Sequence, residues 1–156
     1  MNGATFEVTG NRAWSAPDPG EETEIDLGLR ITNRSNRAVG FNRFDTVSMT
    51  LSNADGAVLR MDGGRNAPRA SEPVSELLEP GESFVIDRSA RLAWRADGRT
   101  MRLIGSDGFG GVWYFDGLRR GTWRVQFVYE NRRGKIGSGY SVWTGKAVTW
   151  ERVELR

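Results

Sequence analysis

The chain has 156 residues, of which 38% are hydrophobic and 27% charged, and its net charge is +2. This length suits one domain, so we expect a single domain over residues 1–156. The sequence contains neither Cys nor His, which excludes disulfides, thiolate nucleophiles, imidazole bases and the usual zinc, iron and copper ligand sets. We therefore expect no enzyme activity, no catalytic residue, no metal and no cofactor.

The distribution of charge and apolar residues limits the partners and the compartment. Arg residues are spread along the whole sequence, whereas a nucleic-acid footprint is concentrated on one face, so we expect no nucleic-acid partner. No run approaches the ~20 apolar residues of a membrane helix, and we expect no membrane insertion. Residues 1–4 lack the basic and apolar regions of a signal peptide. The compartment stays open between the bacterial cytoplasm and export with a leader removed.

The first half of the chain alternates between strand patterns and turns. A short strand is predicted at Thr5–Val8, followed by a turn-rich stretch at residues 15–20 across which Trp14 packs. Thr23–Asn33 then alternates over its whole length, which predicts one strand. Its inward side chains are Ile25, Leu27, Leu29 and Ile31, and its outward ones are Asp26, Arg30 and Thr32.

Residues 47–51 and 58–61 flank Ala54, Asp55 and Gly56, which predicts a hairpin. A two-residue loop would face Leu51 with a charged residue. A three-residue loop with Gly56 in the left-handed conformation pairs Leu51 with Leu59 and Met49 with Met61, so we expect the latter.

The middle of the chain is rich in turn formers. Residues 62–76 are predicted to be a long exposed loop, and residues 84–86 a short strand after a Pro-Gly turn. Residues 96–111 are expected to be irregular, with a brief extended piece at 101–104. Residues 112–115 are either a strand or a buried segment.

Gly121–Glu130 carries the clearest strand pattern, with Trp123, Val125, Phe127 and Tyr129 on one face. The last strand is less consistent, because Val148 and Trp150 share one parity while Val153 and Leu155 share the other. We expect both pairs to be buried, which requires a β-bulge near residues 151–152.

No stretch shows a helical period over three turns, whereas short strands separated by turn signals recur along the chain. This pattern predicts an all-β fold, namely an immunoglobulin-like antiparallel β-sandwich.

Three motifs carry a resemblance to known domains. They are Leu29–Ser35, Leu78–Ser83 and Gly121–Val125, whose order and spacing resemble those of bacterial immunoglobulin-like domains in the BsuPI family of intracellular proteinase inhibitors. The resemblance covers residues 5–155, although this chain is longer, mainly at residues 62–76, at residues 95–117 and in the Trp-containing final loop. It implies a sandwich fold and protein binding, with proteinase inhibition as the specific form. No reactive-site motif matches, so no inhibitory residue is carried over.

The loop from Asn131 to Gly145 has the composition of a recognition loop, because it combines basic residues, glycines and two aromatic side chains. We predict that it contacts a protein partner. The alternative, which we favour for Tyr140 and Trp143, is that these two aromatic side chains fold back and cover one end of the core. The predicted binding residues are Arg132, Arg133, Lys135, Tyr140 and Trp143.

The six tryptophans suggest carbohydrate binding as the alternative function. Trp94, Trp113 or Trp143 would stack on a sugar ring, whereas the strand parity of Trp123 and Trp150 places both in the core. A structural role is favoured for the first three as well, because no two of them lie at alternate positions of one predicted strand to form a flat platform.

Two further patterns have simpler explanations as turns. Five aspartates precede a glycine, and no run of them matches a calcium-binding loop, so we interpret them as turn residues. The triplet Asn33-Arg34-Ser35 matches a glycosylation acceptor, but it is also a turn after a strand. The aspartates are Asp55, Asp62, Asp97, Asp107 and Asp116.

Together these observations predict a non-catalytic domain that binds a protein partner through loops at one end, with carbohydrate binding as the alternative.

Overall fold

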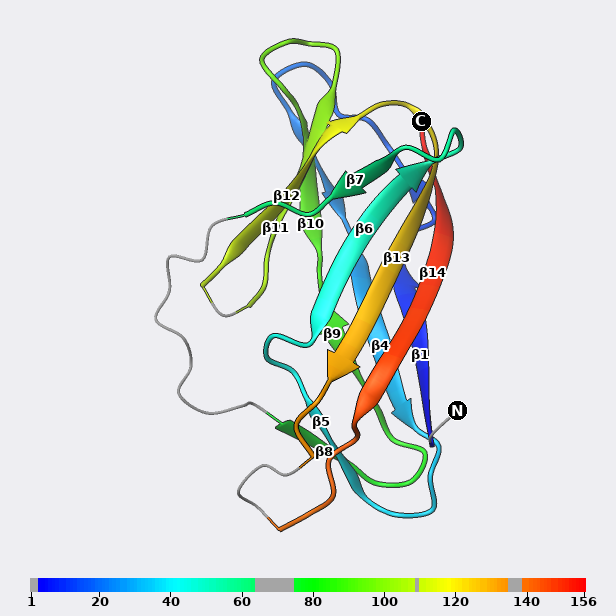
Figure 1. The fold of residues 1–156 in the computed structure, drawn as a ribbon. Coiled ribbons are helices and arrows are strands. Elements are labelled where there is room, and N and C mark those ends of the chain that lie inside the picture. Colours follow the sequence, from blue (N-terminus) through cyan, green and yellow to red (C-terminus); the bar gives the residue numbers. More distant parts are fainter. Residues whose placement is uncertain (1–2, 64–74, 109, 135–138) are drawn as a thin grey trace.

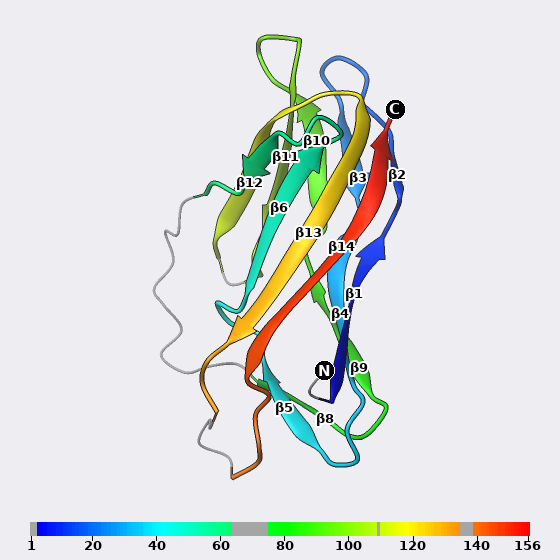
Figure 2. The ribbon, with the colours of Figure 1, turned by 45° about the vertical axis from the view of Figure 1, so that its right-hand side comes forward.

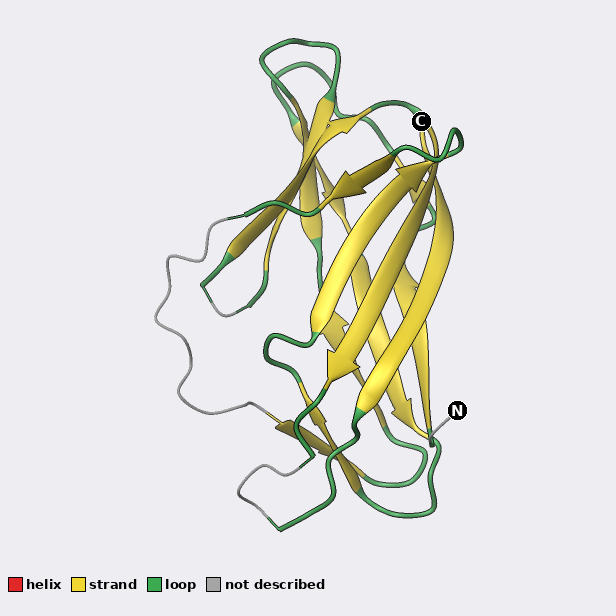
Figure 3. Cartoon of the chain, in the orientation of Figure 1, coloured by secondary structure: helices red, strands yellow, loops and turns green. Residues whose placement is uncertain are grey.

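A computed structural model describes residues 3–63, 75–108, 110–134 and 139–156. The described residues form an all-β fold with several sheets and contain no helix (Figure 3), so none of them belongs to a helix able to cross a membrane. The strands are β1 (Ala4–Gly10), β2 (Ala13–Trp14), β3 (Glu22–Ile25), β4 (Leu27–Asn33), β5 (Val39–Asn42), β6 (Val47–Asn53), β7 (Val58–Arg60), β8 (Ser75–Leu78), β9 (Ser83–Asp87), β10 (Ala90–Trp94), β11 (Met101–Ser106), β12 (Val112–Leu118), β13 (Gly121–Asn131) and β14 (Gly145–Leu155).

The described strands form four sheets (Figures 1 and 2). The largest has the order β2-β14-β13-β6-β7, and the others are β12-β11-β10-β3, β1-β4-β9 and β5-β8. Paired strands run antiparallel, as expected, except that the short β2 lies parallel to β14. This brings Trp14 beside the end of β14, where it is buried.

The strand predicted at 23–33 is divided at Asp26 into β3 and β4, which belong to different sheets. The pairing register is the same on both sides of the break, since Ile25 of β3 pairs with Ala90 of β10 and Gly28 of β4 pairs with Asp87 of β9. At the break the Asp26 carbonyl accepts a hydrogen bond from Asn11 instead of joining a ladder. The four predicted inward side chains are all buried. Thr32, expected outside, is also buried, so its outward placement was wrong.

The hairpin of β6 and β7 has the predicted register. Leu51 pairs with Leu59, and Gly56 has a φ of 81°, which a left-handed loop position requires. The Asn53 N–H closes the three-residue loop on the Ala57 carbonyl at 3.0 Å. β7 ends at Arg60, so Met49 and Met61 are not paired in the ladder.

The middle of the chain is more regular than expected. Residues 101–106 form the complete strand β11 between β10 and β12, and Met101 and Leu103 are fully buried. The Asp97-Gly98 signal marks a tight turn between two strands, because the Asp97 carboxylate accepts bonds from the Arg99 and Thr100 N–H groups. Of the predicted loop 62–76, residues 64–74 lie outside the described part, and residues 75–78 form β8.

The predicted bulge in the last strand is wrong. β13 and β14 pair without interruption from Gly121 with Leu155 to Asn131 with Gly145. Val153 and Leu155 are buried, whereas Val148 and Trp150 are each 54% exposed. The strand does not bury both pairs because its second face points away from the core.

The core is one hydrophobic cluster that draws on all four sheets. The four inward residues of the 121–130 pattern are buried as predicted. Phe127 of β13 and Leu29 of β4 are both fully buried in this cluster, together with Leu103 of β11 and Phe41 of β5.

The Asn33 side chain ties a turn to a neighbouring strand. It is fully buried, and its Nδ2 donates to the carbonyls of Arg37 and Leu78 at 2.8 and 2.9 Å. Its Oδ1 accepts bonds from the Ser35 N–H and hydroxyl. Both amide hydrogens are therefore used inside the protein, which favours the turn over the glycosylation acceptor.

Replacing Asn33 by Ala should lower the free energy of unfolding by about 2–4 kcal/mol, because several buried polar groups lose their partner. Chemical denaturation measures this, with Asn36→Ala as the control, since Asn36 is exposed in the same turn. Equal losses for the two variants would contradict the assignment.

Candidate functional site

The predicted binding residues do not form one surface. Arg132 and Arg133 are exposed just after β13, and Lys135 lies outside the described residues. Tyr140 lies over the backbone of Gly40, where an added Cβ atom would come within 2.5 Å of its ring. Of the four predicted residues that the structure describes, only Arg132 and Arg133 are exposed.

Trp143, the fifth predicted residue, belongs to an aromatic cluster at the edge of the core. Its ring centroid lies 5.1 Å from that of Phe6, 5.5 Å from that of Tyr129 and 6.4 Å from that of Phe41. The alternative that the loop aromatic residues fold back onto the core is confirmed for Trp143.

Among the described residues, no other sheet covers the second side of the largest sheet (Figure 1). Alternation from the buried side chains of β6, β13 and β14 defines it. We call this side the outer face, and it consists of Ser48, Thr50, Ser52, Val58, Arg60, Thr122, Arg124, Gln126, Val128, Glu130, Lys146, Val148, Trp150, Arg152 and Glu154.

Trp150 and Arg124 form the centre of the outer face. The Arg124 guanidinium carbon lies 4.3 Å from the centroid of the Trp150 ring, a cation–π contact between diagonal neighbours on adjacent strands. The contact holds both large side chains in place while the indole stays more than half exposed. Trp150 was assigned to the core from the sequence, and that assignment is wrong.

Exposed apolar side chains collect around this pair. Val148 and Val58 lie on the outer face, and Met61, which is 38% exposed, follows directly after β7. With Trp150 they make four of the seven large hydrophobic side chains that are exposed in the described residues. Concentration on one face, more than exposure itself, is what marks an interaction surface.

Positive charge is concentrated on the same side of the molecule. The outer face with the adjoining Arg132 and Arg133 carries six cationic side chains and two carboxylates, a surplus of four against +2 for the whole chain. Both carboxylates are already paired, Glu130 with Arg132 at 2.7 Å and Glu154 with Arg152 at 2.8 Å. Five arginines from separate parts of the sequence therefore lie on this one side.

Two shallow depressions run along β6 on this side. The first, of ≈ 620 Å³, includes Thr50, Arg60 and Arg124, and the second, of ≈ 470 Å³, includes Arg132 and Arg133. Both are also lined by Ser48 and Met61. This shared lining connects the two predicted arginines to the outer face.

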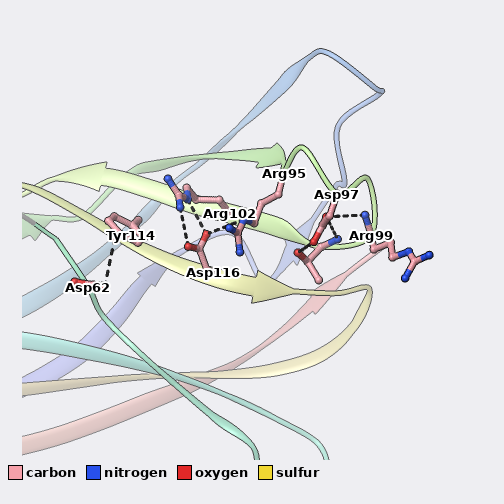
Figure 4. Close-up of polar contacts among 8 residues, drawn as sticks. Asp62, Arg95, Asp97, Arg99, Arg102, Tyr114 and Asp116 are labelled. Atoms are coloured by element: carbon pink, nitrogen blue, oxygen red, sulfur yellow. Dashed lines mark hydrogen bonds and ion pairs between the residues drawn. The ribbon is translucent and has the colours of Figure 1, made fainter.

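A separate polar network lies on the β11–β12 hairpin (Figure 4). Asp116 binds Arg102 through two contacts, from Nε at 2.6 Å and from Nη2 at 2.7 Å, and Arg95 lies 3.7 Å away. The Arg102 guanidinium also stacks on Tyr114 at 4.3 Å. The hydrogen bond from Arg102 holds the pKa of Asp116 below its usual value, which suits an ion-pair partner and not a general acid.

The aspartates that precede glycines divide into two groups. Asp62, Asp97 and Asp107 accept hydrogen bonds from nearby backbone N–H groups, as turn residues do. Asp116 was expected in a turn but lies within β12. In the part of the chain that the structure describes, no three acidic side chains converge as a metal site.

The three tryptophans proposed to stack on sugars differ in accessibility. Trp113 is buried, and Trp143 packs in the aromatic cluster. Trp94 is half-buried, and its indole N–H donates to the Pro17 carbonyl at 2.7 Å. Trp94 lines a pocket.

Comparisons with known proteins identify no family. No protein-family model matches the chain, and no curated protein matches it. A crystal structure of a β-glucosidase from Listeria innocua in complex with gluconolactone matches over 97% of this chain and 16% of that chain, with 14% sequence identity and a TM-score of 0.34. These values are too low to support an argument about this chain.

Sequence reasoning missed the outer face although its signal was present. Alternation placed Arg124 outward, and the shared parity of Val148 and Trp150 is that of an outward face once β14 pairs continuously with β13. The expectation that both pairs of the last strand are buried concealed it.

Replacing Asp116 by Asn should reduce the free energy of unfolding by about 0.5–1 kcal/mol at neutral pH, because it removes a half-exposed ion pair. The folded-state pKa of Asp116 is lowered. The ionised carboxylate therefore stabilises the fold at any pH above the usual aspartate pKa, and this stabilisation is lost as the pH falls through the lowered pKa. The difference from wild type should therefore vanish in acid. Urea denaturation across pH tests this, with Asp55→Asn in an exposed loop as the control, and a pH-independent difference would contradict it.

Proposed function

We propose that the chain is a non-catalytic protein-binding domain whose outer face, with the adjoining Arg132 and Arg133, docks an acidic protein partner. The observation that carries the proposal is the coincidence, on one uncovered sheet face, of exposed apolar side chains and surplus positive charge. Catalytic side-chain types such as His and Cys are lacking, which agrees with a binding role.

The pair of Trp150 and Arg124 supports a protein partner in particular. Trp and Arg are the residue types most enriched at the energetic centres of protein interfaces. Their mutual contact at 4.3 Å fixes both side chains before binding, which lowers the entropy lost on association. Val58, Val148 and Met61 extend the apolar area around them, which a nucleic-acid backbone would not use.

Charge complementarity defines the chemistry of the partner. Both carboxylates of this side already have cationic partners, while Arg60, Arg133 and Lys146 have no ion pair with any described residue. An acidic surface would supply the missing counter-charges and speed association at low salt.

The immunoglobulin-like sandwich is part of the same proposal. It is supported by a single core to which the large sheet and the β1-β4-β9 sheet both contribute, with connecting loops at the two ends (Figure 2). Proteinase inhibition, which the resemblance to the BsuPI family implies, is one form that such binding would take. Full activity of serine and metalloproteinases in the presence of the domain would exclude that form.

The double variant Arg124→Gln/Trp150→Ser should bind a random copolymer of Glu and Tyr at least about tenfold more weakly than wild type, because it removes the centre of the outer face. Biolayer interferometry measures the affinities, and wild-type binding should weaken as NaCl rises from about 50 to about 300 mM.

The control is Arg30→Gln/Val85→Ser, which removes another exposed pair of an arginine and an apolar residue. Arg30 and Val85 are cross-strand partners on β4 and β9, so the same residue types are lost from a different sheet. Equal weakening by both double variants would contradict the assignment of the face. Binding of single-stranded poly-dT or heparin without binding of the copolymer would replace the protein partner by a nucleic acid or a polysaccharide.

A further inference from the structure

The connection between β10 and β11 lies at the end of the molecule opposite β5 and β8 (Figure 1). A further pocket is found there. It has a volume of ≈ 460 Å³, within the range of roughly 300–1,000 Å³ that small-ligand sites occupy. Three segments distant in sequence form it, namely residues 17–20, residues 94–98 and Arg120. We call it the end pocket, and none of its lining residues belongs to the outer face.

Trp94 provides the aromatic wall of the end pocket. It is the last residue of β10 and has the parity of Ala90 and Leu92, both of which are buried. Because it stands at the end of the strand, the core covers it only in part, and it stays half-exposed. The 2.7 Å hydrogen bond from its indole to the Pro17 carbonyl fixes the ring plane, so the wall exists before any ligand arrives.

Two hydrogen-bonded turns hold the remaining walls. The Glu21 N–H donates to the Asp18 carbonyl at 3.0 Å, and the Gly98 N–H donates to the Arg95 carbonyl at 2.9 Å. Asp97 further closes the second turn by accepting bonds from the backbone that follows it. Both segments are therefore shaped locally, independently of a bound molecule.

One acceptor and one donor stand beside the aromatic wall. The Asp18 carboxylate and the Arg120 guanidinium both belong to the lining, and neither side chain has a hydrogen bond or ion pair with a described residue. The third charged residue of the lining, Arg95, already has a partner in Asp116, 3.7 Å away. A carboxylate accepts from hydroxyl groups and a guanidinium donates to them. Their opposite charges favour a neutral ligand rich in hydroxyls.

We propose that the end pocket binds a neutral monosaccharide unit, which is independent of the protein-binding role of the outer face. The apolar C–H face of a pyranose ring would lie on Trp94, as expected of an aromatic surface with one polar end. Asp18 and Arg120 would bind ring hydroxyls at the rim. A charged ligand would leave one of these two groups facing a like charge, which disfavours it.

The probes are the methyl glycosides of glucose, galactose, mannose, xylose and N-acetylglucosamine, each in its α and β form. Titrations followed by 1H–15N NMR report on the six indole N–H signals separately, and Trp94→Phe assigns the signal of Trp94. We expect at least one glycoside to shift that signal in a saturable way. Asp18→Asn and Arg120→Gln should each weaken the binding by about fivefold or more, since each loses a hydrogen bond of a charged group.

The matched controls are Glu21→Gln and Arg119→Gln, which change a neighbouring charge outside the lining of the pocket and should leave the affinity within about twofold. The proposal is overturned if no glycoside shifts the Trp94 signal, or if both pocket variants bind like wild type. It is also overturned if the shifted indole is that of Trp150, identified with Trp150→Ser. The copolymer assay is read separately, so the protein-binding proposal stands or fails without affecting this result.

Discussion

The uninterrupted pairing of β13 with β14 on one side and β6 on the other is the constraint on which the rest of the structure depends. In a continuous ladder every second side chain lies on the same face. Once Phe127 and Val125 are buried, the positions of Trp150 and Arg124 on the opposite face are fixed. A bulge would have turned Trp150 inward, and the centre of the outer face would not exist.

The same constraint explains why the two faces of the largest sheet differ in chemistry. The inner face contributes to a core of aromatic and aliphatic side chains. The outer face keeps Ser, Thr and Gln along its middle strands, with apolar and cationic side chains between them. A stable scaffold needs only the buried inner face, so the outer face is available for binding.

Much of the fold was predictable because it depends on local periodicity. The pattern around Phe127 and the turn at Gly56 each identify an element from a few neighbouring residues. The break at Asp26 was not predictable, because it coincides with a hydrogen bond from Asn11, which follows β1 and is distant in sequence. The placement of Tyr140 over Gly40 was likewise inaccessible, since it depends on a contact with β5, which is distant in sequence. The grouping of arginines needed the strand order, which no local pattern contains.

The two candidate sites make different demands on the fold. The outer face is built from side chains of paired strands, so its geometry is as rigid as the ladder itself and it suits a large, flat partner surface. The end pocket is built where β10 stops, and its walls are turns that close on their own hydrogen bonds. Trp94 packs against the core and donates a hydrogen bond to the Pro17 carbonyl, so it anchors the pocket lining to the core. The lining shares no residue with the outer face. If both proposals hold, the two ligands would not compete, and substitutions at one site would leave the other intact.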